Sequence, residues 1–208
     1  ALINDDLRAF DEAAFQFGGA AIRKEKDVVW AIITGNPAMG DGFALFSTEH
    51  ENIVAAPDVP SVAQFDEMDR LIGMQIGLRG DADADDTEQL SLSMRYALVP
   101  RKLRLTTMQA LGLVEGYYPA TASATIPSDF GIEVISEPRL DRYSTTKYFG
   151  VADPAQVPTI VYGYLQGEAG PVMESDMGFE VDAVTYKIRH VFGAGPEDHR
   201  GFVSNPDT

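Results

Sequence analysis

Residues 184–192 read Val-Thr-Tyr-Lys-Ile-Arg-His-Val-Phe and form the longest alternating stretch of the chain. Apolar or aromatic side chains and His190 occupy every second position, while Lys187 and Arg189 stand between them. A period of two places the two sets on opposite faces of a β-strand. The stretch therefore predicts one long strand with one buried face. On that face we expect His190 to be hydrogen-bonded rather than to bind a metal.

The start of the chain predicts a long amphipathic helix. Asn4 can cap it, and apolar residues then recur at steps of three and four: Leu7, Phe10, Ala14, Phe17 and Ala21. If the helix continues through Ile32, it is about 45 Å long at 1.5 Å per residue. The pair Gly18-Gly19 weakens its middle, where we expect a bend.

The segments between these two predict a mixture of helices and strands. The glycines and proline of residues 35–42 predict a turn, and Ser61 with Gln64 resembles a capping box that opens a helix over 62–72. A shorter helix is expected over about 102–111. Strands are expected over residues 92–98, 132–135, 148–151 and 159–165. Helices early and strands late predict an α+β fold with segregated layers.

Composition excludes several classes of function. The chain has 208 residues, 16 basic and 32 acidic side chains, a formal charge of −16 and no cysteine. Disulfides, cysteine-ligated metals and thiol catalysis are therefore excluded. The charge argues against gripping nucleic acid through the overall field, which needs a basic face. No apolar run approaches the ~20 residues that a membrane span requires.

Motifs for catalysis or cofactor binding are missing from the sequence. It contains neither a G-x-S-x-G elbow nor a glycine-rich phosphate loop. We interpret His50 as part of a solvated loop and His199 as an ordinary turn residue. The predicted catalytic, cofactor-binding and metal residues are therefore none, and no cofactor is expected.

The acidic stretch 81–88 predicts an exposed loop. Asp81, Asp83 and Asp85 have the spacing of the first half of a calcium loop, but Asp86 stands where its glycine belongs and Leu92 where its glutamate belongs. A solvated loop is the first interpretation. An inter-subunit or divalent-ion contact is the alternative.

Basic residues gather near the middle of this acidic chain, at Arg95, Arg101, Lys102 and Arg104. Residues 1–100 carry 7 basic and 18 acidic groups, net −11, and residues 101–208 carry 9 and 14, net −5. This asymmetry suits charge-complementary association between copies. Solvated flanks of a strand and a helix explain the cluster equally well.

The order of several short phrases resembles a known family over almost the whole chain. The phrases are Ile3-Asn4-Asp5-Asp6-Leu7-x-x-Phe10, Gly35-Asn36-Pro37 through Asp41-Gly42, Ala44-Leu45-Phe46-Ser47 with His50-x-Asn52, Tyr96-Ala97-Leu98-Val99-Pro100, Asp153-Pro154 with Pro158, Tyr164-Leu165-x-Gly167, Lys187-Ile188-Arg189-His190-x-Phe192-Gly193 and Asp198-x-Arg200-Gly201. In this order they resemble the major capsid (major head) proteins of tailed bacteriophages, in particular the Mu-type major head subunit branch of the Hong Kong 97 capsid fold.

The resemblance implies a domain arrangement. Residues 1–33 would be the spine helix of a peripheral domain, and 34–165 the axial domain. Residues 166–208 would return to the peripheral domain with the long strand and the C-terminus. The N-terminal arm and extended loop that clasp neighbouring subunits in this family would be absent, since the expected helix begins at residue 4. From this we expect a fragment or a processed form that is monomeric or weakly associating by itself.

The resemblance also implies a function. The chain would be a non-enzymatic structural subunit of an icosahedral phage head, self-assembling around double-stranded DNA without binding it specifically. Its partners would be copies of itself in hexamers and pentamers, with scaffold, portal or decoration proteins as further candidates. It would be found in the virion and be assembled in the bacterial host cytoplasm, with no membrane contact. An encapsulin-like compartment subunit is the alternative, and a hydrolase or protease domain is less favoured.

Overall fold

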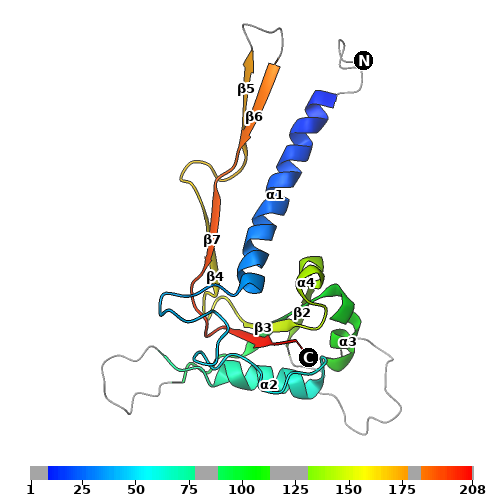
Figure 1. Ribbon diagram of the computed structural model, residues 1–208, viewed down its shortest axis with the longest axis vertical. Coiled ribbons are helices and arrows are strands. Elements are labelled where there is room, and N and C mark those ends of the chain that lie inside the picture. The colour runs from blue at the N-terminus through cyan, green and yellow to red at the C-terminus, as the bar shows by residue number, and fades with distance from the viewer. Residues whose placement is uncertain (1–8, 78–88, 113–130, 178–183, 208) are drawn as a thin grey trace. The chain divides into compact units, whose positions relative to one another are not determined.

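A computed structural model describes residues 9–77, 89–112, 131–177 and 184–207. The acidic stretch 81–88, with Asp81, Asp83 and Asp85, lies outside the described residues, so its predicted loop stays a prediction. Within the described part, no helix is long and apolar enough to cross a membrane. The chain forms two compact units (Figure 1). Unit 1 comprises residues 1–33 and 161–195, and unit 2 comprises residues 34–160 and 196–208.

Unit 2 is built on a four-stranded sheet with the order β2-β1-β3-β8. Strand β1 is parallel to β2 and antiparallel to β3, and β3 is antiparallel to β8. The strands are β1 (Met94–Val99), β2 (Glu133–Ser136), β3 (Tyr148–Ala152) and β8 (Phe202–Asn205). The first three lie where strands are expected. Strand β8 was not predicted, because all four of its residues are buried and it shows no alternation.

Helix α2 (Val62–Gly73) packs against β1, β3 and β8 of this sheet. Its predicted position is confirmed, and the Ser61 hydroxyl accepts a hydrogen bond from the Gln64 amide at 3.3 Å. The Gln64 side chain turns away and donates to the Ala56 carbonyl instead, so only half of the capping box forms. Three apolar residues on one face of α2 are buried: Phe65, Met68 and Ile72.

Three short helical segments complete unit 2. The helix expected over about 102–111 is a 3-10 turn, Arg101–Leu103, that continues as α3 (Arg104–Ala110). Helix α4 (Pro138–Tyr143) was not predicted, because six residues are too few to show an apolar stripe. The Asp141 carboxylate of α4 accepts the backbone amides of Arg101 and Lys102 and joins the two segments.

Unit 1 contains one long helix and two strand pairs. Helix α1 (Ala9–Gly35) has 27 residues, most of which belong to this unit. Strands β4 (Ile160–Tyr164) and β7 (Phe192–Pro196) form one pair. Strands β5 (Val172–Met177) and β6 (Val184–Arg189) form the other, an antiparallel ribbon. Figure 1 shows this ribbon in yellow and orange.

The prediction of a single long strand over 184–192 with one buried face is wrong in two respects, because the strand is broken and Tyr186 on its apolar face is 48% exposed. The strand is interrupted at His190 and Val191, so that β6 pairs with β5 while β7 pairs with β4. Alternation alone cannot reveal this break, because both halves keep the same period. What changes between them is the partner strand, which comes from elsewhere in the chain.

The limits of the two units differ from the expected domains at their C-terminal sides. The central unit ends at Ile160 rather than at residue 165. Residues 196–208 belong to unit 2 instead of returning to the unit of the long helix. The reason is β8, whose backbone completes the sheet beside β3. The first segment of unit 1 ends at Ile33.

Burial differs sharply between the units. The apolar core lies in unit 2 and includes Phe65, Tyr148 and Val203, all inaccessible to solvent. Among the side chains described in unit 1, only that of Ile33 is buried. Unit 1 nevertheless carries many exposed large apolar residues: Phe17, Ile22, Val161, Tyr162, Tyr164, Leu165, Met173, Tyr186 and Val191. It therefore lacks a closed core of its own within the described residues.

Candidate functional site

A tight loop in unit 2 begins where α1 ends. Asn36 has a φ of 46°, a left-handed conformation that asparagine tolerates well. Its side chain then accepts the Phe46 amide at 2.7 Å and donates to the Phe46 carbonyl at 3.0 Å. These two bonds mimic a strand partner and close the loop. Asp41 lies at the tip of the loop, where its Oδ1 accepts the Phe43 amide at 3.0 Å.

His50 lies in the turn that follows this loop. Its side chain is 4% exposed, so the predicted solvated position is wrong. The ring Nδ1 lies 3.2 Å from the Leu45 carbonyl oxygen, and Nε2 lies 2.8 Å from Asp41 Oδ2. The rings of Phe43 and His50 pack edge to face, with their centroids 6.1 Å apart. Nearby Asn52 donates to the same Leu45 carbonyl and fixes its position.

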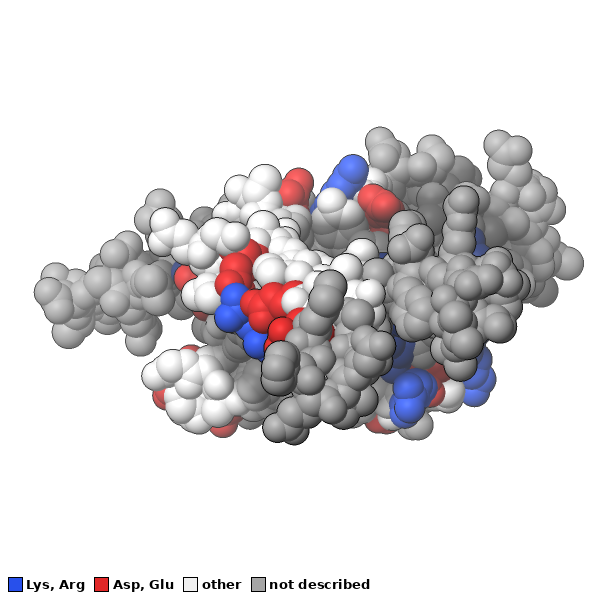
Figure 2. Space-filling view, turned by 90° about the horizontal axis from the view of Figure 1, so that it is seen from above, with Lys and Arg blue, Asp and Glu red and all other residues white. Residues whose placement is uncertain are grey.

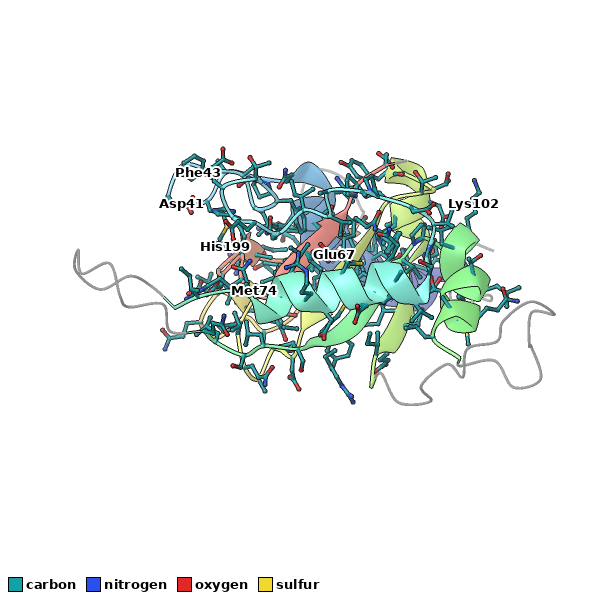
Figure 3. The ribbon with its side chains drawn as sticks, turned by 90° about the horizontal axis from the view of Figure 1, so that it is seen from below. Asp41, Phe43, Glu67, Met74, Lys102 and His199 are labelled. Carbon is teal, nitrogen blue, oxygen red and sulfur yellow. The ribbon has the colours of Figure 1, made fainter. Side chains whose placement is uncertain are left out.

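His199 reaches this place from the other end of the sequence. Its ring stacks on that of His50 with a centroid distance of 3.7 Å and an interplanar angle of 4°. The His199 carbonyl accepts the Phe202 amide, so the turn is fixed to the start of β8. His199 does lie in a turn, but its half-buried ring joins a cluster that the turn alone did not predict. Figure 3 shows Asp41, Phe43 and His199 at one end of unit 2, with Lys102 at the other.

The charges of this cluster follow from its contacts. The hydrogen bond from His50 and that from the Phe43 amide lower the pKa of Asp41, which is a carboxylate at neutral pH. Burial, together with the neighbouring ring of His50, lowers the pKa of His199 below its usual value. His199 is therefore a neutral imidazole with a free electron pair at neutral pH. The ligand atoms of Asp41, His50 and His199 all lie within 4.8 Å of one another.

A second polar network lies in unit 1. His190 Nε2 is 2.7 Å from Glu25 Oε1, and the Tyr164 hydroxyl donates to Glu25 Oε2 at 3.2 Å. The expected hydrogen bond of His190 is thus present, although the residue lies between β6 and β7 rather than within a strand. Tyr162, Tyr164 and Phe192 pack ring to ring beside it and line a pocket of about 240 Å³.

The β5–β6 ribbon has two chemically different faces. Its register pairs Met173 with Ile188 and Ser175 with Tyr186. Because paired residues of antiparallel strands share a face, these side chains form one mainly apolar face. Met173 is 50% exposed and Tyr186 is 48% exposed. We call Met173, Tyr186 and Ile188 the ribbon face.

The opposite face of the ribbon is charged. It carries an ion pair between Lys187 and Glu174 at 3.1 Å, together with Arg189, which pairs with Glu168. The described surface in Figure 2 likewise shows acidic and basic side chains next to one another.

The basic cluster in unit 2 is exposed, as both sequence interpretations require. Arg95 donates to the Gly131 carbonyl at 2.7 Å, and Lys102 Nζ donates to the Thr145 hydroxyl at 3.3 Å. The side chains of Arg101 and Arg104 are also exposed. These positions lie on β1 and at the start of the following helical turn.

Comparison with known proteins gives the class of this chain. A family model described as phage capsid protein matches residues 1–205. Searches of curated proteins and of solved structures gave no match. The chain belongs to the phage capsid protein family. It is thus a structural subunit of the virion, with copies of itself as partners in a shell.

Proposed function

We propose that the chain is the major head subunit of a tailed bacteriophage, of the Mu-type branch of the Hong Kong 97 fold, and that it self-assembles into an icosahedral shell around double-stranded DNA. In this proposal α1 is the spine helix, unit 1 is the peripheral domain and unit 2 is the axial domain. The family match over residues 1–205 carries the proposal. The order of the short phrases along the sequence supports the finer assignment.

The contrast in burial between the units supports assembly. A two-stranded ribbon is marginally stable unless its apolar face packs on another element. The ribbon face and the exposed rings of Tyr162 and Tyr164 are apolar surface of this kind. Contacts with neighbouring copies in a shell would cover them. Unit 2 already has a closed core and needs no such cover.

The net charge of −16 fits a container for DNA. Binding to the phosphate backbone requires clustered basic side chains. A mostly acidic wall would let packaged DNA slide past without adhering. Scaffold, portal and decoration proteins remain proposed partners, with assembly in the host cytoplasm.

The test is to isolate particles from the bacterium that carries the gene, with a tag on the chain. We expect the chain to sediment with particles that contain nuclease-resistant DNA and to be their most abundant protein by mass spectrometry. Tagged chain in DNA-free particles that enclose an enzyme would instead favour the encapsulin-like alternative. Absence of the chain from DNA-filled heads would refute the proposal.

A further inference from the structure

We infer that Asp41, His50 and His199 form a binding site for a divalent transition-metal ion of the Zn²⁺ type. The inference does not depend on the proposed capsid function, because it concerns three side chains within unit 2. The three donors come from a loop, a turn and the segment before β8. An ion held between them would fasten residues 197–200 to residues 36–51.

The surroundings of His50 carry the argument. Its Nδ1 faces the Leu45 carbonyl oxygen and its Nε2 faces the Asp41 carboxylate, so both nitrogens face acceptors. A neutral imidazole has only one N–H to donate. While Nε2–H donates to Asp41 at 2.8 Å, the electron pair of Nδ1 faces the Leu45 carbonyl oxygen at 3.2 Å. A metal ion that replaces the proton shared by Nε2 and Asp41 lets Nδ1–H donate to Leu45 and removes the conflict.

The surrounding hydrogen bonds are those of a metal centre. Ligand histidines usually donate their second ring N–H to a carbonyl or carboxylate, which fixes the tautomer. The Leu45 carbonyl occupies that position at 3.2 Å from Nδ1. Ligand carboxylates are themselves hydrogen-bonded, and Asp41 Oδ1 accepts the Phe43 amide. Asp41 Oδ2 then remains directed toward His50.

The donor set selects the class of ion. Two imidazoles and one carboxylate suit Zn²⁺ and related transition metals, whereas Ca²⁺ and Mg²⁺ prefer oxygen ligands alone. Three protein ligands leave a position for water. The side chain of Asp41 is 42% exposed, so water and the ion can enter from its side.

One movement is required of His199. Its ring is parallel to that of His50, and a metal–nitrogen bond lies in the plane of the imidazole. Both rings therefore cannot bind one ion while they are stacked at 3.7 Å. We expect metal binding to rotate the His199 ring out of the stack. Loss of the stack is a signature that a purely structural pair of histidines would not give.

Calorimetric titration of the full chain with ZnCl₂ tests the inference, with MgCl₂ as a second titrant. We expect one Zn²⁺ per chain and no comparable binding of Mg²⁺. Asp41→Asn and His199→Gln change side chains that are not fully buried, so both variants should fold. Each should lower the affinity for Zn²⁺ by at least about tenfold. Removing a residue that only hydrogen-bonds to a metal ligand already costs about tenfold, so removing a ligand should cost no less.

His190→Gln is the matched control. His190 also faces a carboxylate, that of Glu25, but it is not part of the three-donor cluster. This variant should bind Zn²⁺ like the unmodified chain. Equal loss of binding in His190→Gln and His199→Gln, or no Zn²⁺ binding by the unmodified chain, would overturn the inference.

Nitrogen NMR of the histidine rings gives an independent result. Zn²⁺ should shift the resonances of His50 and His199 and leave those of His190 in place. Rings of His50 and His199 that remain unchanged at saturating Zn²⁺ would show that a proton, not a metal, joins His50 to Asp41, and the inference would be wrong.

Discussion

Gly150 lies in the middle of β3, where side chains from two other elements approach its backbone closely. A Cβ added there would lie 2.6 Å from Met94 Sδ and 2.7 Å from Val203 Cγ1. The methionine can adjust, but the branched valine on β8 has little freedom. Gly150→Ala should therefore lower the free energy of unfolding by about 1–3 kcal/mol, the usual cost of overpacking.

Denaturant unfolding of Gly150→Ala checks this value. Gly163→Ala is the control, because Gly163 also lies in a strand and a Cβ there meets no atom within 4 Å. We expect the control to unfold at nearly the same denaturant concentration as the unmodified chain. Equal effects of the two substitutions would contradict the packing argument.

Tyr148 is the largest fully buried side chain of the core. Its hydroxyl donates to the Asp58 carbonyl at 3.0 Å and accepts from Asn205 Nδ2 at 2.9 Å. Tyr148→Phe leaves the Asp58 carbonyl without this donor, so we expect a loss of about 1–2 kcal/mol in unfolding free energy. Tyr162→Phe, at a 65% exposed position, should change it by less than about 0.5 kcal/mol.

Tyr148 also predicts a pH dependence. Burial, with a further contribution from the charge of Asp58, raises the pKa of the phenol well above its ordinary value of 10.0. The folded chain then holds this proton more tightly than the unfolded chain. The contribution to stability is complete below pH 10 and is lost as pH rises above it. The free energy of unfolding, measured from pH 8 to 11, should fall less steeply with pH for Tyr148→Phe than for the unmodified chain. Parallel pH dependences would show that Tyr148 is not the group responsible.

The residues next to His50 in the sequence explain why the histidine cluster was not predicted. His50 was interpreted as solvated because its immediate neighbours are polar. Its burial comes from Leu45 and from His199, which is 149 positions away. The Asn36 side chain that closes the loop gives a weak local signal, since asparagine before proline favours a turn. No residue near His50 in the sequence indicates that the ring of His199 covers the ring of His50.

The helix α2 shows what periodicity predicts well among the elements. Its apolar residues recur at helical spacing, and Ser61 marks its start, so both its position and its buried face could be predicted. Ser61→Ala should cost about 1 kcal/mol of unfolding free energy, because the Gln64 amide loses its acceptor. Ser61→Asp restores an acceptor and should recover most of the loss. Equal thermal unfolding of all three proteins would contradict the capping role.

Strands were harder to predict than α2, for two physical reasons. Strand β8 is buried on both sides, so it has no polar alternation that could reveal it. Strands β6 and β7 alternate continuously, yet their partners differ. A strand's ends depend on the segments that pair with it. The sequence of the strand therefore shows its faces but not where its pairing stops.

At the scale of the whole molecule, the ribbon face predicts a defect in assembly. Tyr186→Lys places a charge among Met173 and Ile188, where a neighbouring copy would have to bury it. Thr185→Lys adds the same charge on the opposite face, across from Asp176. In cells that express the full set of head genes, we expect Tyr186→Lys to reduce the particle yield more than about tenfold. A loss of ~1.4 kcal/mol at one contact between copies already lowers the association constant of that contact tenfold. Thr185→Lys should form particles normally.

Gradient centrifugation of the lysates measures that yield. Both variants should remain as stable as the unmodified chain in thermal unfolding, because both positions are exposed. Normal particles from Tyr186→Lys would show that the ribbon face stays in solvent in the shell.

Because β8 pairs with β3 from a position much later in the chain, this part of the sheet can form only after β8 has been synthesised. Residues 153–201 must be translated after β3 before β8 exists. At about 5–20 residues per second, this takes roughly 2–10 s. During that interval one edge of β3 has no partner, and an open edge can pair with a strand of another nascent chain. We expect crowded polysomes to be the place where this protein is most liable to misassemble, and slow translation of residues 153–201 to increase that risk.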